Sequence, residues 1–225
     1  MSGPYRRAYE GEIPQQITCG SDDEPWSTKW CEVLAQGFGP RWKEGVKILD
    51  YGCGYGRFCN YMTEWFQKFE YTGLEVPNNE HAERCIAFAK RYYGNRGQFN
   101  YLGGNVEAAA LDSVDVVLLG SVFTHFTFTR FIEVFKWFIP TIERGGAVVF
   151  TVIPGIEYTL GLNGALGLDG FYTYSRFTAK QMAEWWAGIN GSFTLTKTGS
   201  LVTMYSFPDT SEKIVHDVYR VEKEP

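Results

Sequence analysis

The chain has 225 residues, of which 44% are hydrophobic and 21% are charged, and its formal net charge is −5. This is the composition of a globular domain, and no stretch approaches the roughly 18 consecutive apolar residues that a membrane-spanning helix needs. Acidic residues outnumber basic ones by 26 to 21, so the chain has no broad basic field for phosphate backbones and nucleic acid is disfavoured as a partner.

The N-terminus and the cysteines both favour a cytoplasmic protein. The opening residues 1–7 are not followed by the apolar core of a signal peptide. The cysteines are odd in number and include no C-x-x-C pair, which argues against a disulfide framework and against a zinc cluster. They are Cys19, Cys31, Cys53, Cys59 and Cys85.

Residues 1–40 are expected to form an N-terminal arm and a short helix that together act as a cap. Residues 1–25 are polar, contain three prolines and show no hydrophobic period. Ser27 can cap a helix that ends near Gly37 and Gly39. Residues 41–225 then form a single domain, since their length suits one well-buried core.

A glycine-rich turn is the most informative feature of the chain. Residues 46–49 predict a short buried strand, Asp50 follows it, and Gly52, Gly54 and Gly56 then alternate with larger residues. Glycine reaches positive φ easily and lets a ligand approach the backbone closely. Apolar residues with helical spacing follow at once, namely Phe58, Tyr61, Met62, Trp65, Phe66 and Phe69. Strand, glycine turn and helix together open a nucleotide-binding βαβ unit.

The glycine spacing distinguishes between two kinds of nucleotide ligand. A dinucleotide fingerprint needs glycine at its first, third and sixth positions, and the sixth position counted from Gly52 is Arg57. Asp50 also suits a cationic ligand better than a pyrophosphate. A nicotinamide-dependent oxidoreductase, which shares this opening, stays open as an alternative.

The next segments along the chain place polar residues at the ends of predicted strands. Residues 71–76 predict a second strand, and Glu75 near its end stands about 20 residues beyond Gly52, where a carboxylate typically binds ribose hydroxyls. A helix over residues 82–93 and a third strand over 98–102 follow, and the third strand leads to Asn105 and Val106.

The apolar run over residues 115–121 predicts a central parallel strand that is buried on both faces. It ends at Ser121 and leads to His125, and ligands of open α/β sheets lie beyond such strand ends. Residues 128–142 then carry one apolar stripe of a helix, in which Pro140 tightens or ends the last turns. A fifth strand is predicted over residues 147–153.

The last third of the chain is less regular. Residues 154–174 are expected to form a long irregular segment with an aromatic end that includes Tyr172, and loops of this length are usually functional or mobile. Thr178 and Gln181 form a capping box that opens a helix. Residues 192–197 and 214–221 predict two final strands, and residues 201–208 are left without an assignment.

The segment Asp50–Gly56 resembles the first motif, D/E-x-G-x-G-x-G, of the class I S-adenosylmethionine-dependent methyltransferases. The order of strands, helices and acidic positions over residues 47–153 and near the C-terminus is also similar to that family. The resemblance implies an α/β fold with a doubly wound, mostly parallel Rossmann-like sheet and an antiparallel C-terminal edge strand pair. It further implies S-adenosyl-L-methionine as cofactor and methyl transfer to an oxygen, nitrogen or carbon atom of a small-molecule acceptor.

The resemblance also implies a set of cofactor-binding residues. Asp50 would orient the charged amino acid end of the cofactor, Glu75 would bind ribose, and Asn105 would face the adenine amino group, where the family more often has Asp. In the family, N-terminal arms often close over the ligands, although the arm pattern here fits a plain surface segment equally well. The implied binding set is Asp50, Gly52, Cys53, Gly54, Gly56, Glu75, Val76, Asn105, Val106 and Ser121.

Methyl transfer from a sulfonium is an in-line displacement, for which positioning can supply about 7–11 kcal/mol without a covalent intermediate. Some methyl-accepting molecules also need a general base that takes up the proton they release. His125 is the first candidate and Tyr172 the second, with no metal expected. His125 can equally be a residue that hydrogen-bonds the loop backbone, and Tyr172 can serve packing alone. A non-catalytic subunit that binds S-adenosylmethionine is a further alternative.

Overall fold

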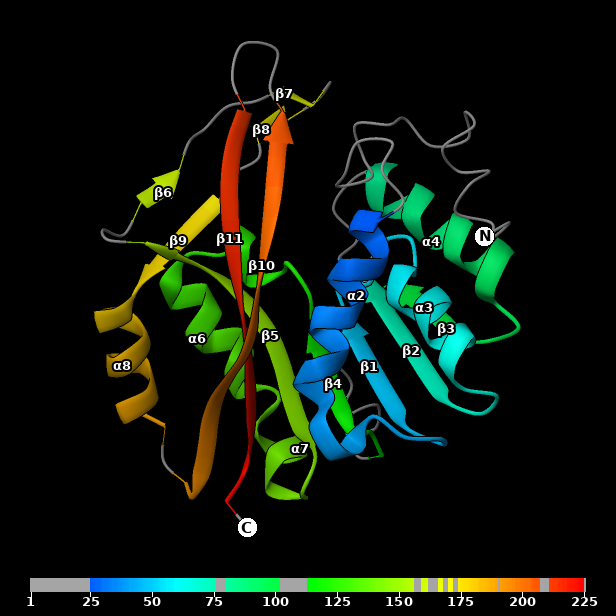
Figure 1. The fold of residues 1–225 in the computed structure, drawn as a ribbon, viewed down its shortest axis with the longest axis horizontal. Helices are drawn as coiled ribbons and strands as arrows, with labels where there is room; N and C mark the ends of the chain where they lie inside the picture. The colour runs from blue at the N-terminus through cyan, green and yellow to red at the C-terminus, as the bar shows by residue number, and fades with distance from the viewer. Residues whose placement is uncertain are drawn as a thin grey trace.

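The computed structural model describes residues 25–75, 80–101, 113–155, 159–161, 166–167, 170–171, 174–189, 191–206 and 211–224. Its centre is a mixed sheet with the strand order β10-β11-β5-β4-β1-β2-β3 (Figure 1). The parallel strands are β1 (Lys47–Tyr51), β2 (Glu70–Glu75), β3 (Gln98–Tyr101), β4 (Val116–Leu119) and β5 (Ala147–Gly155).

The C-terminal strands are β10 (Phe193–Ser206) and β11 (Ser211–Lys223). β11 lies between β5 and β10 and runs antiparallel to both. The predicted fold class, a doubly wound and mostly parallel sheet with an antiparallel C-terminal strand pair, is therefore confirmed.

Helices cover both faces of the sheet, which explains why its central strands are apolar without alternation. One face carries α2 (Pro25–Phe38), α3 (Arg57–Trp65) and α4 (Glu80–Tyr93). The other carries α6 (Phe128–Lys136), α7 (Ile139–Glu143) and α8 (Ala179–Ala187). Among the residues described, no helix has both the length and the apolarity to cross a membrane.

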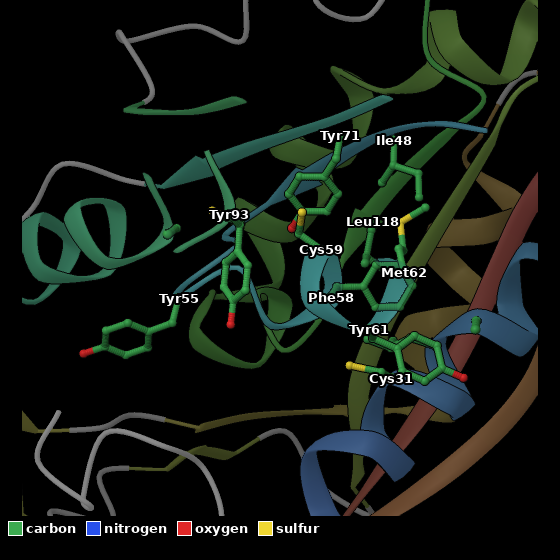
Figure 2. Packing of buried hydrophobic residues seen from close by; sticks show 14 of the residues in the cluster. Cys31, Ile48, Tyr55, Phe58, Cys59, Tyr61, Met62, Tyr71, Tyr93 and Leu118 are labelled. Carbon is green, nitrogen blue, oxygen red and sulfur yellow. The ribbon is translucent and has the colours of Figure 1, made fainter. Parts of the chain in front are cut away.

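Each face has its own hydrophobic core because side chains alternate along a strand. In β1, Ile48 faces the core beneath α2, α3 and α4, and Leu49 faces the core on the other side. Figure 2 shows the first core, where Phe58 and Met62 from α3 meet Ile48 and Leu118 from the sheet.

Helix α2 packs against the sheet. It contacts β5, β10, β11 and α3, and Leu34 and Phe38 are buried in the first core. Ser27 lies inside this helix and not at its cap, since the helix already includes Pro25, and proline suits a first helical turn. Whether residues 1–24 act as a cap stays a prediction, because they lie outside the described residues.

The single helix expected over residues 128–142 is two helices. α6 ends at Lys136, and α7 starts at Ile139 with Pro140 in its first turn. Proline lacks the backbone N–H that a helix start leaves unbonded in any case, so it begins the second helix. The apolar stripe continues across the break, because Phe135 and Ile142 are both buried in the second core.

The C-terminal strands are much longer than the sequence indicates. Residues 201–206, which had no assignment, belong to β10. Only residues 217–222 of β11 pair with β5, and the rest of β11 pairs with β10 alone. The paired strands extend as a hairpin above the rest of the sheet (Figure 1).

The segment over residues 154–174 contains short strands. They are β6 (Thr159–Gly161), β7 (Leu166–Gly167) and β8 (Gly170–Phe171), followed by β9 (Tyr174–Thr178). β9 pairs with β5 from Ile153 to Gly155, just beyond the point where β5 leaves β11. The capping box of Thr178 and Gln181 then starts α8 as predicted.

Candidate functional site

The turn after β1 has the backbone geometry for which its glycines are suited. Gly52, Gly54 and Gly56 have φ values of +76°, +52° and +76°, a region that other residues adopt only with strain. A Cβ on Gly52 would come within 2.6 Å of the Val122 side chain, and one on Gly56 within 3.1 Å of two aromatic rings. A Cβ on Gly54 would meet no atom of the described residues within 4 Å. Gly54 is therefore the glycine of this turn whose missing side chain faces open space.

The backbone amides of the turn are bonded to the end of β2. Gly52 and Cys53 donate to the carbonyl oxygen of Leu74, at 2.7 and 3.1 Å. Gly54 donates to Oε2 of Glu75 at 2.8 Å, and Gly56 donates to the Cys53 carbonyl at 3.0 Å. These four backbone amides are therefore bonded within the protein and not directed at a ligand anion, and the negatively charged Glu75 carboxylate lies beside the turn. Both facts disfavour a pyrophosphate and, with it, the nicotinamide alternative.

Asp50 points into the core and not along the turn. Its carboxylate is only 5% exposed, and Oδ2 accepts a hydrogen bond from the hydroxyl of Tyr71 on the neighbouring strand β2. The pKa of Asp50 is raised to about 7, chiefly by burial and to a smaller extent by the charge of Glu75, while the Tyr71 hydrogen bond opposes this rise. Contact between Asp50 and the amino acid end of a cofactor stays a prediction.

Ser121 has an unusual conformation just beyond the end of β4. Its φ of +64° makes it the one non-glycine residue with positive φ in the part of the chain that the structure describes. Its amide donates to Oγ1 of Thr151 at 2.8 Å, and its carbonyl accepts from Oγ1 of Thr124 at 2.7 Å. Such strained positions persist where the surroundings hold them and often mark functional sites.

His125 lies in the short helix η4 (Phe123–His125), which follows β4, and its side chain is exposed. A second histidine, His216 on β11, is near enough that the two charges interact. His216 is 1% exposed, neither of its ring nitrogens has a hydrogen-bond partner among the described residues, and its ring meets the Trp30 ring edge-on at 5.3 Å. The pKa of His216 is lowered to about 4, chiefly by burial and to a smaller extent by the charge of His125.

Sequence reasoning did not single out His216. The one signal in the sequence is its place between Ile214 and Val218, where a polar residue interrupts an alternating apolar row. That signal identifies a buried position, but only the fold brings it near His125.

The structure brings most of the predicted site residues to one end of the sheet. Asp50, the glycine turn and Glu75 meet where β1 and β2 end, and Ser121 and His125 follow β4, the other neighbour of β1. The close approach of Gly52 to Val122 places the turn directly against the chain beyond β4. Val76, Asn105, Val106 and Tyr172 lie outside the described residues, so their roles stay predictions.

The fold is that of an α/β protein whose parallel strands end at one edge of the sheet, which is where proteins of this class bind their ligands. The model of a family described as "Methyltransferase domain" matches residues 25–191. The chain therefore belongs to this methyltransferase domain family. A comparison with curated proteins found no match.

Several solved structures are similar over almost the whole chain. Magnesium protoporphyrin IX methyltransferase from Synechocystis with bound S-adenosylhomocysteine is 16% identical, with a TM-score of 0.55 over 98% of this chain and 93% of that chain. The DhpI complex with S-adenosylhomocysteine is 14% identical, with a TM-score of 0.58 over 98% and 93% of the two chains. A putative zinc-dependent alcohol dehydrogenase from Rhodobacter sphaeroides is 13% identical, with a TM-score of 0.59 over 100% of both chains.

At these identities the solved structures share the fold with this chain, and the fold alone does not separate a transferase from an oxidoreductase. The match to the methyltransferase family model identifies the chain as a transferase and not an oxidoreductase. The protein is an S-adenosylmethionine-dependent methyltransferase domain, with S-adenosylmethionine as its cofactor.

Proposed function

We propose that the enzyme transfers the methyl group of S-adenosylmethionine to a small-molecule acceptor, at an oxygen, nitrogen or carbon nucleophile. The observation that supports this most is the open space in front of Gly54, next to the Glu75 carboxylate and at the carboxyl end of β1. A small acceptor is favoured over nucleic acid because the net charge of the chain is −5.

In this proposal the turn and the end of β2 hold the adenosyl part of the cofactor. A carboxylate has about four acceptor positions, so the Glu75 carboxylate that binds the Gly54 amide can also accept ribose hydroxyls. Val76, Asn105 and Val106 would surround the adenine. The ionised form of Asp50 would attract the cationic groups of the cofactor through its field, and Ser121 would border the amino acid end.

The bound cofactor supplies an activated methyl group, and the protein aligns the acceptor with it. We assign to His125 the proton that a hydroxyl or amine acceptor releases as its new bond to carbon forms. This assignment is supported by the position of the exposed imidazole just after the end of β4, because ligands of open α/β sheets lie beyond such strand ends. Tyr172 is the second candidate for this role.

Calorimetric titration with S-adenosylmethionine and, separately, with NAD tests the donor assignment. A screen for S-adenosylhomocysteine formation with small phenols, alcohols, amines and carbon acids then tests the acceptor class, with transfer RNA and duplex DNA as comparison substrates. We expect tighter binding of S-adenosylmethionine and turnover of a small acceptor. Tighter NAD binding would support the oxidoreductase alternative, and binding without turnover would support a partner subunit.

Replacing Glu75 tests the ribose assignment. Glu75→Ala removes the acceptor for the ribose hydroxyls and for the Gly54 amide, so we expect the binding free energy of S-adenosylmethionine to weaken by about 1–3 kcal/mol. Glu70→Ala is the matched control, because Glu70 lies on the same strand and makes an exposed ion pair with Lys47 at 3.1 Å. Equal affinities of the two variants, measured by calorimetry, would contradict the assignment.

A further inference from the structure

The strain at Ser121 requires a cause in the surrounding structure. A left-handed conformation costs a non-glycine residue about 1–2 kcal/mol. The strained residue is nevertheless Ser121 and not its neighbour Gly120. The conformation of Ser121 persists because its neighbours determine it.

Two buried threonines hold both backbone polar groups of Ser121. Thr151 on β5 accepts the hydrogen bond of the amide, and Thr124 in η4 donates one to the carbonyl. Both threonines are 0% exposed. A hydrogen bond in a buried place is costly to leave unmade, by about 1–3 kcal/mol, so the two threonines define one conformation of Ser121.

The position of Thr151 explains why the Ser121 amide bonds to a side chain of β5 and not to its backbone. β4 and β5 pair up to Leu119 and Phe150, and the chain beyond Leu119 turns away from β5. The amide of Ser121 therefore bonds to the side-chain hydroxyl of the next β5 residue, Thr151, where a regular ladder would offer a backbone carbonyl. The hydroxyl sets where the chain goes as it leaves the central strand.

That exit borders the proposed cofactor site. The side chain of Val122, the residue after Ser121, lies 2.6 Å from the position that a Cβ on Gly52 would take. A change in the Ser121 backbone would move Val122 relative to the glycine turn and alter the width of the space in front of Gly54.

We propose that Thr151 is a positioning residue for S-adenosylmethionine: its hydroxyl holds Ser121 in the left-handed conformation in which the end of β4 binds the amino acid part of the cofactor. The proposal rests on the proposed function, because it assumes that the cofactor occupies the edge formed by the ends of β1, β2 and β4.

Three variants at two positions test this role. Thr151→Val keeps the shape and removes the hydroxyl, whereas Thr151→Ser keeps the hydroxyl. Thr141→Val is the matched control, because Thr141 is also 0% exposed but its hydroxyl has no partner among the described residues. Calorimetry gives the affinity for S-adenosylmethionine, and thermal unfolding without ligand gives the stability of each variant.

We expect Thr151→Val to bind S-adenosylmethionine about tenfold or more weakly, and Thr151→Ser and Thr141→Val to bind like the wild type. A role in stability alone would lower the melting temperature of Thr151→Val and leave its affinity unchanged, which would overturn the proposal. Loss of affinity in Thr151→Ser would overturn it as well, because the hydroxyl would then not be the determinant.

Two further outcomes are distinguished from a failure of the positioning role of Thr151. If the wild type itself does not bind S-adenosylmethionine, the proposed function fails, whatever the variants do. If Thr151→Val does not fold, Thr124→Val makes the same test from the other side, since it releases the Ser121 carbonyl; wild-type affinity in that variant would count against the proposal.

Discussion

The Gly54→Val variant is expected to fold and to lose S-adenosylmethionine binding. The first carbon of the new side chain has room, because a Cβ at this position meets no atom of the described residues within 4 Å. That room is the space that we assign to the cofactor, so the valine and the ligand would compete for it. We expect the affinity measured by calorimetry to fall by about 100-fold or more, equivalent to about 3 kcal/mol.

Strain must be separated from steric exclusion in this experiment. Gly54 has φ +52°, and valine there costs at least about 1–2 kcal/mol of stability. Gly45→Val is the matched control, because Gly45 has φ +81° and lies at the opposite end of β1. In the part of the chain that the structure describes, its Cβ position also has no atom within 4 Å. We expect Gly45→Val to lower the melting temperature and to retain binding.

Normal affinity in Gly54→Val would show that the glycine turn is not the cofactor site. A similar loss of affinity in both valine variants would attribute the effect to strain in the strand that they flank, and would remove the support that the open space gives to the proposed function.

The pH dependence of stability is expected to contain two opposed contributions of similar size. Burial raises the pKa of Asp50 from 3.8 to about 7, so the folded protein retains a proton that the unfolded chain loses. This contribution is fully present below about pH 4 and is lost as the pH rises toward 7. It corresponds to about 4 kcal/mol.

His216 acts in the opposite direction. Burial lowers its pKa from 6.5 to about 4, so the unfolded chain binds a proton that the folded protein excludes. Its contribution to stability is present above about pH 6.5 and is lost as the pH falls toward 4, and it corresponds to about 3 kcal/mol. Two charged groups contribute to this lowered pKa of about 4 besides burial: His125 acts to lower it and Asp217 acts to raise it.

Two substitutions separate these contributions in urea unfolding without cofactor. Asp50→Asn keeps an oxygen for the Tyr71 hydroxyl, and we expect its stability relative to wild type to increase by about 4 kcal/mol between about pH 4 and about pH 7. His216→Leu should change by about 3 kcal/mol in the opposite direction over the same range. If the stability of each variant relative to wild type is independent of pH, neither group is buried as the structure shows.

Local patterns were sufficient to predict the class of fold and the position of the turn. The apolar runs of β1, β4 and β5 mark strands that are covered on both faces, and the glycines after Asp50 mark a turn with positive φ. Local patterns failed where the structure depends on contacts with other segments of the chain. The stripe over residues 128–142 did not reveal the break between α6 and α7, and residues 201–206 of β10 pair with the part of β11 that does not pair with β5.

The parallel α/β sheet, the carboxylate-flanked glycine turn and the place of Glu75 at the next strand end could all be predicted, because each depends on residues close together in the chain. The folded structure was needed to see that Asp50 faces Tyr71, that Thr151 holds Ser121, and that His216 lies near His125. These pairs join residues on different strands and loops. Their contacts depend on the order and register of strands in the sheet, which no local periodicity specifies.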